Sequence, residues 1–163
     1  MRSLTQRLLL VALASLLLTT AAAAQKKQML LGPQLGFATN YFDLFIGAQF
    51  SYPVAPQFDF YPSFDIYFPG NSVTVWALNG DVRYWPKLNM PNAGLYVGAG
   101  LNYTHISVDF GPPTGSVSNS EVGLGLLGGW DFKAVSWRPF AQLRIVVGNA
   151  DRVEFGGGVN FKL

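Results

Sequence analysis

Most of the chain after residue 30 alternates, with a period of two, between large apolar residues and small or polar ones. Between residues 94 and 104, one parity reads Leu95, Val97, Ala99, Leu101 and Tyr103, and the other reads Tyr96, Gly98, Gly100, Asn102 and Thr104. A period of two is the signature of a β-strand with two different faces. No helical periodicity appears beyond the first residues, so the sequence predicts an all-β protein.

Eight segments carry this alternation, and turn-forming residues separate them. The expected strands are 31–38, 44–54, 58–68, 76–84, 94–104, 122–132, 137–147 and 153–163. Strands of roughly 9–11 residues are long enough to cross a bilayer at a tilt. The pattern predicts a single eight-stranded antiparallel up-and-down transmembrane β-barrel. Pro62 lies inside one segment and removes a hydrogen-bond donor, so we expect a bulge or local break there.

The N-terminal residues resemble a cleaved secretory signal peptide. Arg2 and Arg7 precede the apolar stretch 8–18, and the small residues Ala21–Ala24 follow it. A basic start, a short apolar core and an Ala-x-Ala-like end are typical of such signals. The alternative is an uncleaved membrane anchor, but the stretch is well short of the roughly 20 residues that a spanning helix needs. We therefore expect a signal peptide at residues 1–24, an outer-membrane barrel domain at 25–163, and export to the bacterial outer membrane.

The composition excludes several other classes of protein. Only 12% of the residues are charged and there is no cysteine, whereas an average soluble protein has about 25% charged residues. Residues 25–163 hold nine Lys and Arg and nine Asp and Glu, so that part of the chain is neutral. A nucleic-acid surface would need clustered basic residues. The sequence therefore predicts no nucleic-acid partner, no cysteine-ligated metal and no cofactor.

Which parity faces the outside of the barrel decides between a membrane barrel and a soluble one. The face opposite the apolar residues is rich in glycine and poor in Lys and Glu: Gly36, Gly47, Gly98, Gly100, Gly123, Gly125, Gly129, Gly156 and Gly158. Such a face is a poor water-exposed surface. Inside an eight-stranded barrel, which side chains just fill, glycines leave room for tyrosines and charges. We therefore expect the apolar face to contact lipid. The alternative is a soluble periplasmic barrel that binds a lipophilic ligand on its apolar face.

Aromatic residues support the membrane interpretation. With the N-terminus in the periplasm, one group falls near the periplasmic end: Tyr52, Phe58, Tyr84, Trp85, Trp130, Phe132, Trp137 and Phe161. A second group falls near the outer end: Tyr41, Phe42, Phe68, Trp76 and Tyr103. Two aromatic girdles are typical of membrane barrels. The longest expected loop, 106–120, then lies outside the cell, and its candidate contact residues are Asp109, Phe110, Pro112 and Pro113.

Four stretches carry a resemblance to a known group of proteins: 94–103 (GLYVGAGLNY), 123–130 (GLGLLGGW), 139–144 (PFAQLR) and 155–163 (FGGGVNFKL). They resemble the small outer-membrane β-barrels of the opacity-protein and OmpA transmembrane-domain type, including the OmpX-like porin family. The resemblance covers residues 25–163 and implies an architecture rather than an activity. It also implies recognition by the barrel-assembly machinery through Phe161 and Leu163, although family members usually end in Phe or Trp.

The inward parity contains the candidate polar site. Its charged members are Asp59, Asp65, Asp81, Arg83, Arg144 and Glu154, with Lys162 on the same parity. Turns centred near residues 149 and 71 place Arg144 opposite Glu154, Asp59 opposite Arg83, and Tyr61 opposite Asp81. Buried charges are tolerated only when they are paired. The network is interpreted as structural filling of the barrel, and the alternative is a plug that gates a narrow pore for small solutes or ions.

No catalytic motif stands out. Lipid A deacylases are also eight-stranded barrels and use a His-x-Ser pair with a Glu. Here His105 and Ser107 share the outward parity, but Glu121 has the opposite one. We therefore expect no enzyme, and instead a monomeric structural or surface-interaction barrel. Its expected partners are outer-membrane lipids, lipopolysaccharide and an unidentified surface ligand.

Overall fold

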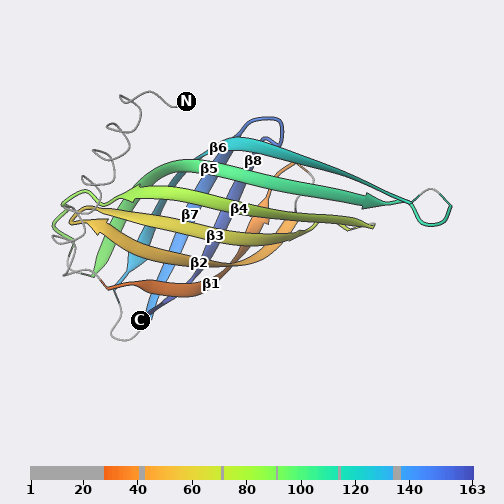
Figure 1. Ribbon diagram of the computed structural model, residues 1–163. Coiled ribbons are helices and arrows are strands. Elements are labelled where there is room, and N and C mark those ends of the chain that lie inside the picture. The colour runs from red at the N-terminus through yellow and green to blue at the C-terminus, as the bar shows by residue number, and fades with distance from the viewer. Residues whose placement is uncertain (1–27, 41–42, 71, 91, 114, 134–136) are drawn as a thin grey trace, which may run out of the picture.

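The chain forms a closed barrel in which eight antiparallel strands follow one another in sequence order (Figure 1). A computed structural model describes residues 28–40, 43–70, 72–90, 92–113, 115–133 and 137–163. The strands are β1 (Leu30–Ala38), β2 (Asp43–Ala55), β3 (Phe58–Phe68), β4 (Val73–Tyr84), β5 (Ala93–Asp109), β6 (Ser116–Phe132), β7 (Trp137–Val147) and β8 (Arg152–Lys162). Pairing of β1 with β8 closes the sheet. The predicted all-β fold with eight strands is confirmed.

None of the described residues belongs to a helix long and apolar enough to cross a membrane. The expected signal peptide, residues 1–24, lies outside the described part of the chain.

The expected long loop 106–120 is wrong, because most of it is strand. β5 and β6 are 17 residues long each, whereas the other strands have 9 to 13. The added residues pair with one another as far as Asp109 and Ser116, with Val108 opposite Val117. β-branched residues such as Ile106, Val108 and Val117 favour strands, and they continue the ladder past the rest of the sheet. Figure 1 shows this hairpin projecting beyond the neighbouring strands, at what we call the hairpin end of the barrel.

Pro62 interrupts one ladder without shifting its register. β2 and β3 pair at Gln49–Ser63 and again at Tyr52–Phe60, which belong to one register, and the pairs between them are missing. On its other side, Pro62 lies opposite Gly80 in the β3–β4 ladder. The expected local break is therefore present and no bulge accompanies it, because the proline lacks only the amide donor. The register shifts of the β2–β3 ladder lie elsewhere, at Asp43/Leu44 and Pro53/Ala55.

The two faces of the sheet have opposite polarity, with the apolar face outside. Leu35, Val122 and Phe155 are more than 60% exposed on the outer wall. Asp81 and Arg144 are at most 1% exposed inside. This is the reverse of a water-soluble protein, in which charged residues are almost never fully buried. The structure therefore gives the apolar parity to the outer wall, as the glycine pattern predicts.

Aromatic side chains surround the outer wall near the end that holds the start of β1 and the finish of β8, which we call the terminal end. The expected residues Tyr52, Phe58, Tyr84, Trp130, Phe132, Trp137 and Phe161 are 37–52% exposed there. Trp85 is an exception, because it packs inward at 5.0 Å from Tyr96 and 5.1 Å from the guanidinium of Arg83. Tyr41 and Phe42 lie outside the described residues.

Glycine is required where the strands approach one another inside the barrel. A Cβ added at Gly100 would lie 2.2 Å from the Gly80 carbonyl oxygen and 2.5 Å from the Asp81 Cα. Both are backbone atoms, so the sheet itself would have to move. A Cβ added at the outward-facing Gly80 would meet only a ring carbon of Phe60, at 3.9 Å.

These two glycines make a matched test of the inward packing. Gly100→Ala is expected to lower the free energy of unfolding by about 1–3 kcal/mol, because the added methyl group overpacks the wall. Gly80→Ala, on the paired strand but facing outward, is expected to leave it unchanged or slightly raised. Urea unfolding in detergent micelles measures both. Equal effects of the two changes would contradict the inward placement of Gly100.

Candidate functional site

The barrel interior is a continuous set of polar side chains. All six charged residues expected there are buried, with exposures of 0–3%: Asp59, Asp65, Asp81, Arg83, Arg144 and Glu154. Lys162 is on the same parity but is exposed at the end of β8. Two further buried charges, Arg152 and Asp131, were not expected. The expected last strand begins at residue 153 and so leaves out Arg152, although its even number gives it the same inward parity as Glu154.

Near the terminal end, Arg83 and Asp59 form a two-point ion pair. Arg83 Nε lies 3.1 Å from Asp59 Oδ1, and Arg83 Nη2 lies 2.7 Å from Asp59 Oδ2. Ser51 donates a further hydrogen bond to Asp59 Oδ2, at 2.7 Å. The guanidinium of Arg83 lies 3.7 Å from the centre of the Tyr61 ring and 4.7 Å from that of Tyr96. The Asp59–Arg83 pairing predicted from the turn near residue 71 is confirmed.

At the centre, Arg144 lies between two carboxylates. Its Nη2 is 2.7 Å from Asp81 Oδ2, and its Nε is 3.6 Å from Glu154 Oε2. The predicted register of Arg144 opposite Glu154 is confirmed, but the shorter contact is with Asp81. Asp81 is on β4 and Arg144 on β7, so this pair crosses the interior. Pairing within one hairpin could not predict it.

Inward glycines on the strands between them make room for this pair. Gly100 of β5 and Gly125 of β6 lie opposite each other. A Cβ at Gly100 would lie 2.6 Å from Asp81 Oδ1, and one at Gly125 would lie 3.8 Å from Arg144 Nη1. The space that these residues leave empty is therefore occupied by the ion pair, as the filled-interior interpretation predicts.

Near the hairpin end, Glu154 is shared with a second arginine. It accepts hydrogen bonds from Arg152 Nε and from the Tyr67 hydroxyl, both at 2.6 Å. Arg152 Nη1 in turn donates to Thr104 Oγ1 at 3.0 Å. Beyond them a small apolar cluster fills the interior: Ala38, Phe45, Tyr67, Val75 and Ala77.

Asp65 is held by amides rather than by an arginine. It accepts hydrogen bonds from Gln34 Nε2 at 2.5 Å and from Asn79 Nδ2 at 2.9 Å. Asn102 donates a hydrogen bond to Asn79 at 2.7 Å, and Gln142 donates one to Gln34 at 3.2 Å. These bonds connect five strands across the interior, so most of the buried polar groups share one network.

The three residues weighed as a deacylase site are not brought together. His105 Nδ1 lies 2.9 Å from Ser120 Oγ rather than bonding Ser107, and its ring stacks on Trp76 at 5.2 Å. Glu121 accepts a hydrogen bond from its neighbour Asn119. Among the residues that the structure describes, no group of three His, Asp or Glu could hold a metal ion.

The candidate surface residues lie at the tip of the projecting hairpin. Asp109 Oδ1 accepts a hydrogen bond from the Gly111 amide at 2.9 Å, and the Phe110 amide bonds the Gly115 carbonyl. Phe110 is 59% exposed, and Pro112 and Pro113 are exposed beside it. At the opposite end, Phe161 and Leu163 are 50% and 63% exposed on the outer wall.

Comparisons of the structure identify the class of fold. The chain is similar to the N-terminal β-barrel domain of Pseudomonas aeruginosa OprF, at a TM-score of 0.69 and 16% identity, over 84% of this chain and 98% of that one. It is also similar to Neisserial surface protein A, at a TM-score of 0.65 and 19% identity, over 83% of this chain and 96% of that one. Ail, the attachment invasion locus protein of Yersinia pestis, matches at a TM-score of 0.55 and 12% identity, over 83% of this chain and 97% of that one. The chain therefore has the fold of the small eight-stranded outer-membrane barrels.

Sequence comparison alone gives no relative. No family model matches the chain, and no match is found among curated proteins.

Removal of Arg144 tests whether the interior pairs are formed. Arg144→Ala leaves Asp81 buried without its cation and removes one of the two arginines that face Glu154. We therefore expect a loss of about 3–5 kcal/mol in unfolding free energy. Lys87→Ala, at an exposed position, is the control and is expected to change it by less than about 0.5 kcal/mol. Urea unfolding in detergent, followed by tryptophan fluorescence, measures both. An Arg144 variant as stable as the parent would contradict the pairing.

Proposed function

We propose that the chain is an outer-membrane β-barrel with a side-chain-filled interior and a structural or surface-interaction role. The observation that carries this proposal is the inverted polarity of the barrel, with paired charges inside and a broad apolar wall outside. In a bilayer such a wall contacts acyl chains, and closure of the sheet leaves no edge strand unpaired. A soluble ligand-binding barrel would need an apolar interior that lines a ligand pocket. The buried charges argue against that alternative.

The orientation follows from the two ends of the barrel. Outer-membrane barrels have short periplasmic turns and longer extracellular segments. The β5–β6 hairpin is the part that projects furthest (Figure 1), so we infer that the hairpin end faces the outside and the terminal end the periplasm. This places exposed Phe110 and Val117 (59% and 63%) where a surface ligand can reach them. The ligand is unidentified.

Other expected partners are part of the same proposal. The apolar wall would contact outer-membrane lipids and lipopolysaccharide, and the exposed Phe161 and Leu163 would be recognised by the barrel-assembly machinery. We propose a monomer with no enzymatic activity.

A narrow pore is the second candidate, and one observation favours it. Glu154 lies within 2.6 Å of Arg152 and 3.6 Å of Arg144, so either arginine could take it as its main partner. An exchange of that kind could open a path along the interior. The structural role is preferred because arginines and tyrosines are the largest fully buried side chains and occupy the lumen, as is usual for barrels of this size.

A denaturing gel of the outer-membrane fraction tests the location and the fold together. We expect unboiled protein to migrate differently from boiled protein, because a closed membrane barrel stays folded in the detergent until it is heated. Recovery in the soluble periplasm without a mobility shift would contradict the proposal.

Bilayer conductance separates the two candidate roles. A plugged barrel is expected to show no stable openings in a planar bilayer, and Lys87→Gln should behave like the parent. Regular openings that change with Glu154→Gln would favour the pore and contradict the structural role.

A further inference from the structure

Closure of the barrel does not extend to the projecting part of β6. The β6–β7 ladder starts at Leu124, which pairs with Val147, and runs from there toward the terminal end. On its other side, β6 pairs with β5 as far as Ser116. Among the residues that the structure describes, none pairs with residues 116–123 on the β7 side. This stretch belongs to the projecting hairpin (Figure 1), so the sheet has an open edge there.

The turn between β7 and β8 covers the inner end of this stretch. A Cβ added at Gly148 in that turn would lie 3.0 Å from the Gly123 Cα and 3.2 Å from the Val122 carbonyl oxygen. Residues 116–121 are left, and we call them the open edge. All of them except the last are exposed, so another strand has free access to them.

An open edge of this kind is a template for strand pairing, because its outer N–H and C=O groups have no ladder to join. β5 offers no such edge, since its residues 105–108 pair with β4 on one side and with β6 on the other. Exposed edges are commonly protected by lysine, proline or a bulge. The open edge reads SVSNSE, with no lysine, no proline and no register shift. It is therefore suited to strand addition, a recurring mode of peptide recognition.

Carboxylates lie at both ends of the open edge. Asp109 is opposite Ser116 at the outer end. Glu121 closes the inner end, where its Oε1 accepts a hydrogen bond from Asn119 at 2.9 Å and its Oε2 has no hydrogen-bond partner. Asp151 is exposed in the β7–β8 turn beside that end. The free carboxylate oxygen of Glu121 can accept a hydrogen bond from a cationic side chain.

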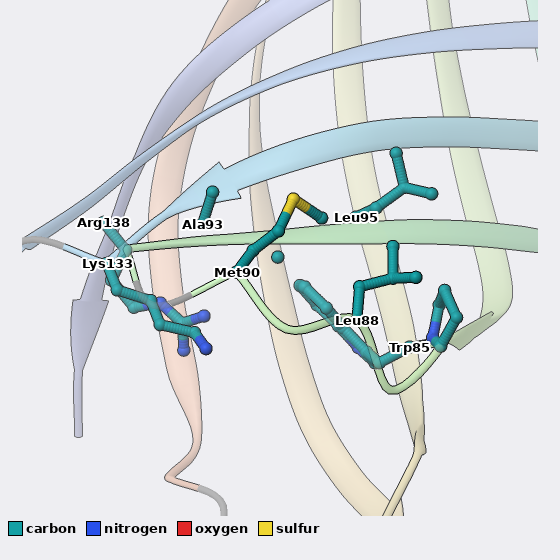
Figure 2. A pocket seen from close by; sticks show the side chains of 9 residues that line it. Trp85, Leu88, Met90, Ala93, Leu95, Lys133 and Arg138 are labelled. Atoms are coloured by element: carbon teal, nitrogen blue, oxygen red, sulfur yellow. The ribbon is translucent and has the colours of Figure 1, made fainter.

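The exposed cations of the described residues are all at the opposite end of the barrel. Lys87, Lys133 and Lys162 are exposed at the terminal end, and Figure 2 shows the nitrogen-bearing ends of Lys133 and Arg138 lying together there. At the hairpin end, Arg152 is 1% exposed and bonded inside the barrel. The carboxylates around the open edge thus have no exposed Lys or Arg among the described residues of that end. Their charge is complementary to a basic partner.

The side chains of the open edge define which residues such a partner needs. Val117 and Glu121 have the same parity, so they lie on one face, four positions apart. In a strand antiparallel to β6, a basic residue opposite Glu121 therefore comes four positions before an apolar residue opposite Val117. The other face presents only serine hydroxyls and takes polar residues: Ser116, Ser118 and Ser120.

We propose that the open edge binds an extended segment of a basic polypeptide as an additional antiparallel strand. Backbone hydrogen bonds hold the segment, Glu121 pairs with one of its Lys or Arg side chains, and Val117 contacts an apolar one. The inference rests on the proposed surface role and orientation, and it names the kind of partner that this surface takes.

Amide hydrogen exchange, measured by NMR in detergent micelles, tests the added strand. The probe is the acetylated and amidated heptapeptide KTVTVTT, which places lysine opposite Glu121 and valine opposite Val117. We expect it to slow exchange at alternate amides of residues 116–121, because only every second amide of a strand points to one side. KPVPVPP has the same lysine and valines but cannot form the ladder, and it should slow none of them.

Variants separate the charge from the apolar contact, and the affinity is measured from peptide titrations. Glu121→Gln is expected to lower the affinity for KTVTVTT about two- to fivefold, the contribution of an exposed ion pair, and to remove its advantage over ETVTVTT. Val117→Ser should weaken binding of both peptides. Val122→Ser is the matched control, because Val122 is equally exposed on β6 but lies outside the open edge (66% against 63%). The heat-dependent gel shift checks that each variant is folded.

Three outcomes would overturn the inference. No slowing by KTVTVTT, or equal slowing by KPVPVPP, would exclude strand addition. Slowing confined to amides outside residues 116–121 would exclude this site. Equal affinity for KTVTVTT and ETVTVTT in the parent protein would exclude a basic partner. Micelles leave both ends of the barrel in water, so these results do not depend on the cellular location. Recovery in the soluble periplasm would contradict the proposed function without changing them.

Discussion

Closure of the sheet is the constraint on which the rest of the molecule depends. The pairing of β1 with β8 gives every strand two neighbours, so neither edge of the sheet is left open. In a hydrocarbon environment an unpaired amide or carbonyl costs several kcal/mol, and closure removes that cost from the wall as a whole. The outer side chains can then be apolar because the backbone needs no water. Even at Pro62, where the β2–β3 ladder lacks its pairs, the two strands resume pairing in the same register.

Eight strands enclose little space, and that determines the chemistry of the interior. The inward parity holds glycines such as Gly100 and Gly125, and the volume they free is occupied by charged side chains from other strands. Arg144 contacts Asp81 across the lumen and Glu154 along its own hairpin. Each of these charges is buried, so each needs its partner. The same pairs that stabilise the barrel also fill it, which is why we propose a structural or surface role before a pore.

Much of this could be predicted from the sequence, because alternation with a period of two is a local signal. Strand positions, the inward face and the Arg83–Asp59 pair all follow from parity and turn position. Contacts across the lumen do not, because they depend on closure, and the Asp81–Arg144 pair is of this kind. The position of Trp85 along the chain predicts a place in the aromatic girdle, whereas its odd number gives it the inward parity that the structure shows. The Ser and Asn residues of the outer β5–β6 hairpin resemble a loop in the sequence, whereas in the structure Val108 and Val117 pair across it.

The central claim is that the apolar parity faces lipid, and spin-label accessibility tests it most directly. The chain has no cysteine, so single cysteines at Leu101 and Leu124, which lie opposite each other on β5 and β6, can each carry a nitroxide label. In reconstituted vesicles both labels should collide readily with oxygen, which concentrates in the bilayer, and rarely with a water-soluble nickel complex. High accessibility to the nickel complex and low accessibility to oxygen at both positions would place this face in water and contradict the membrane assignment.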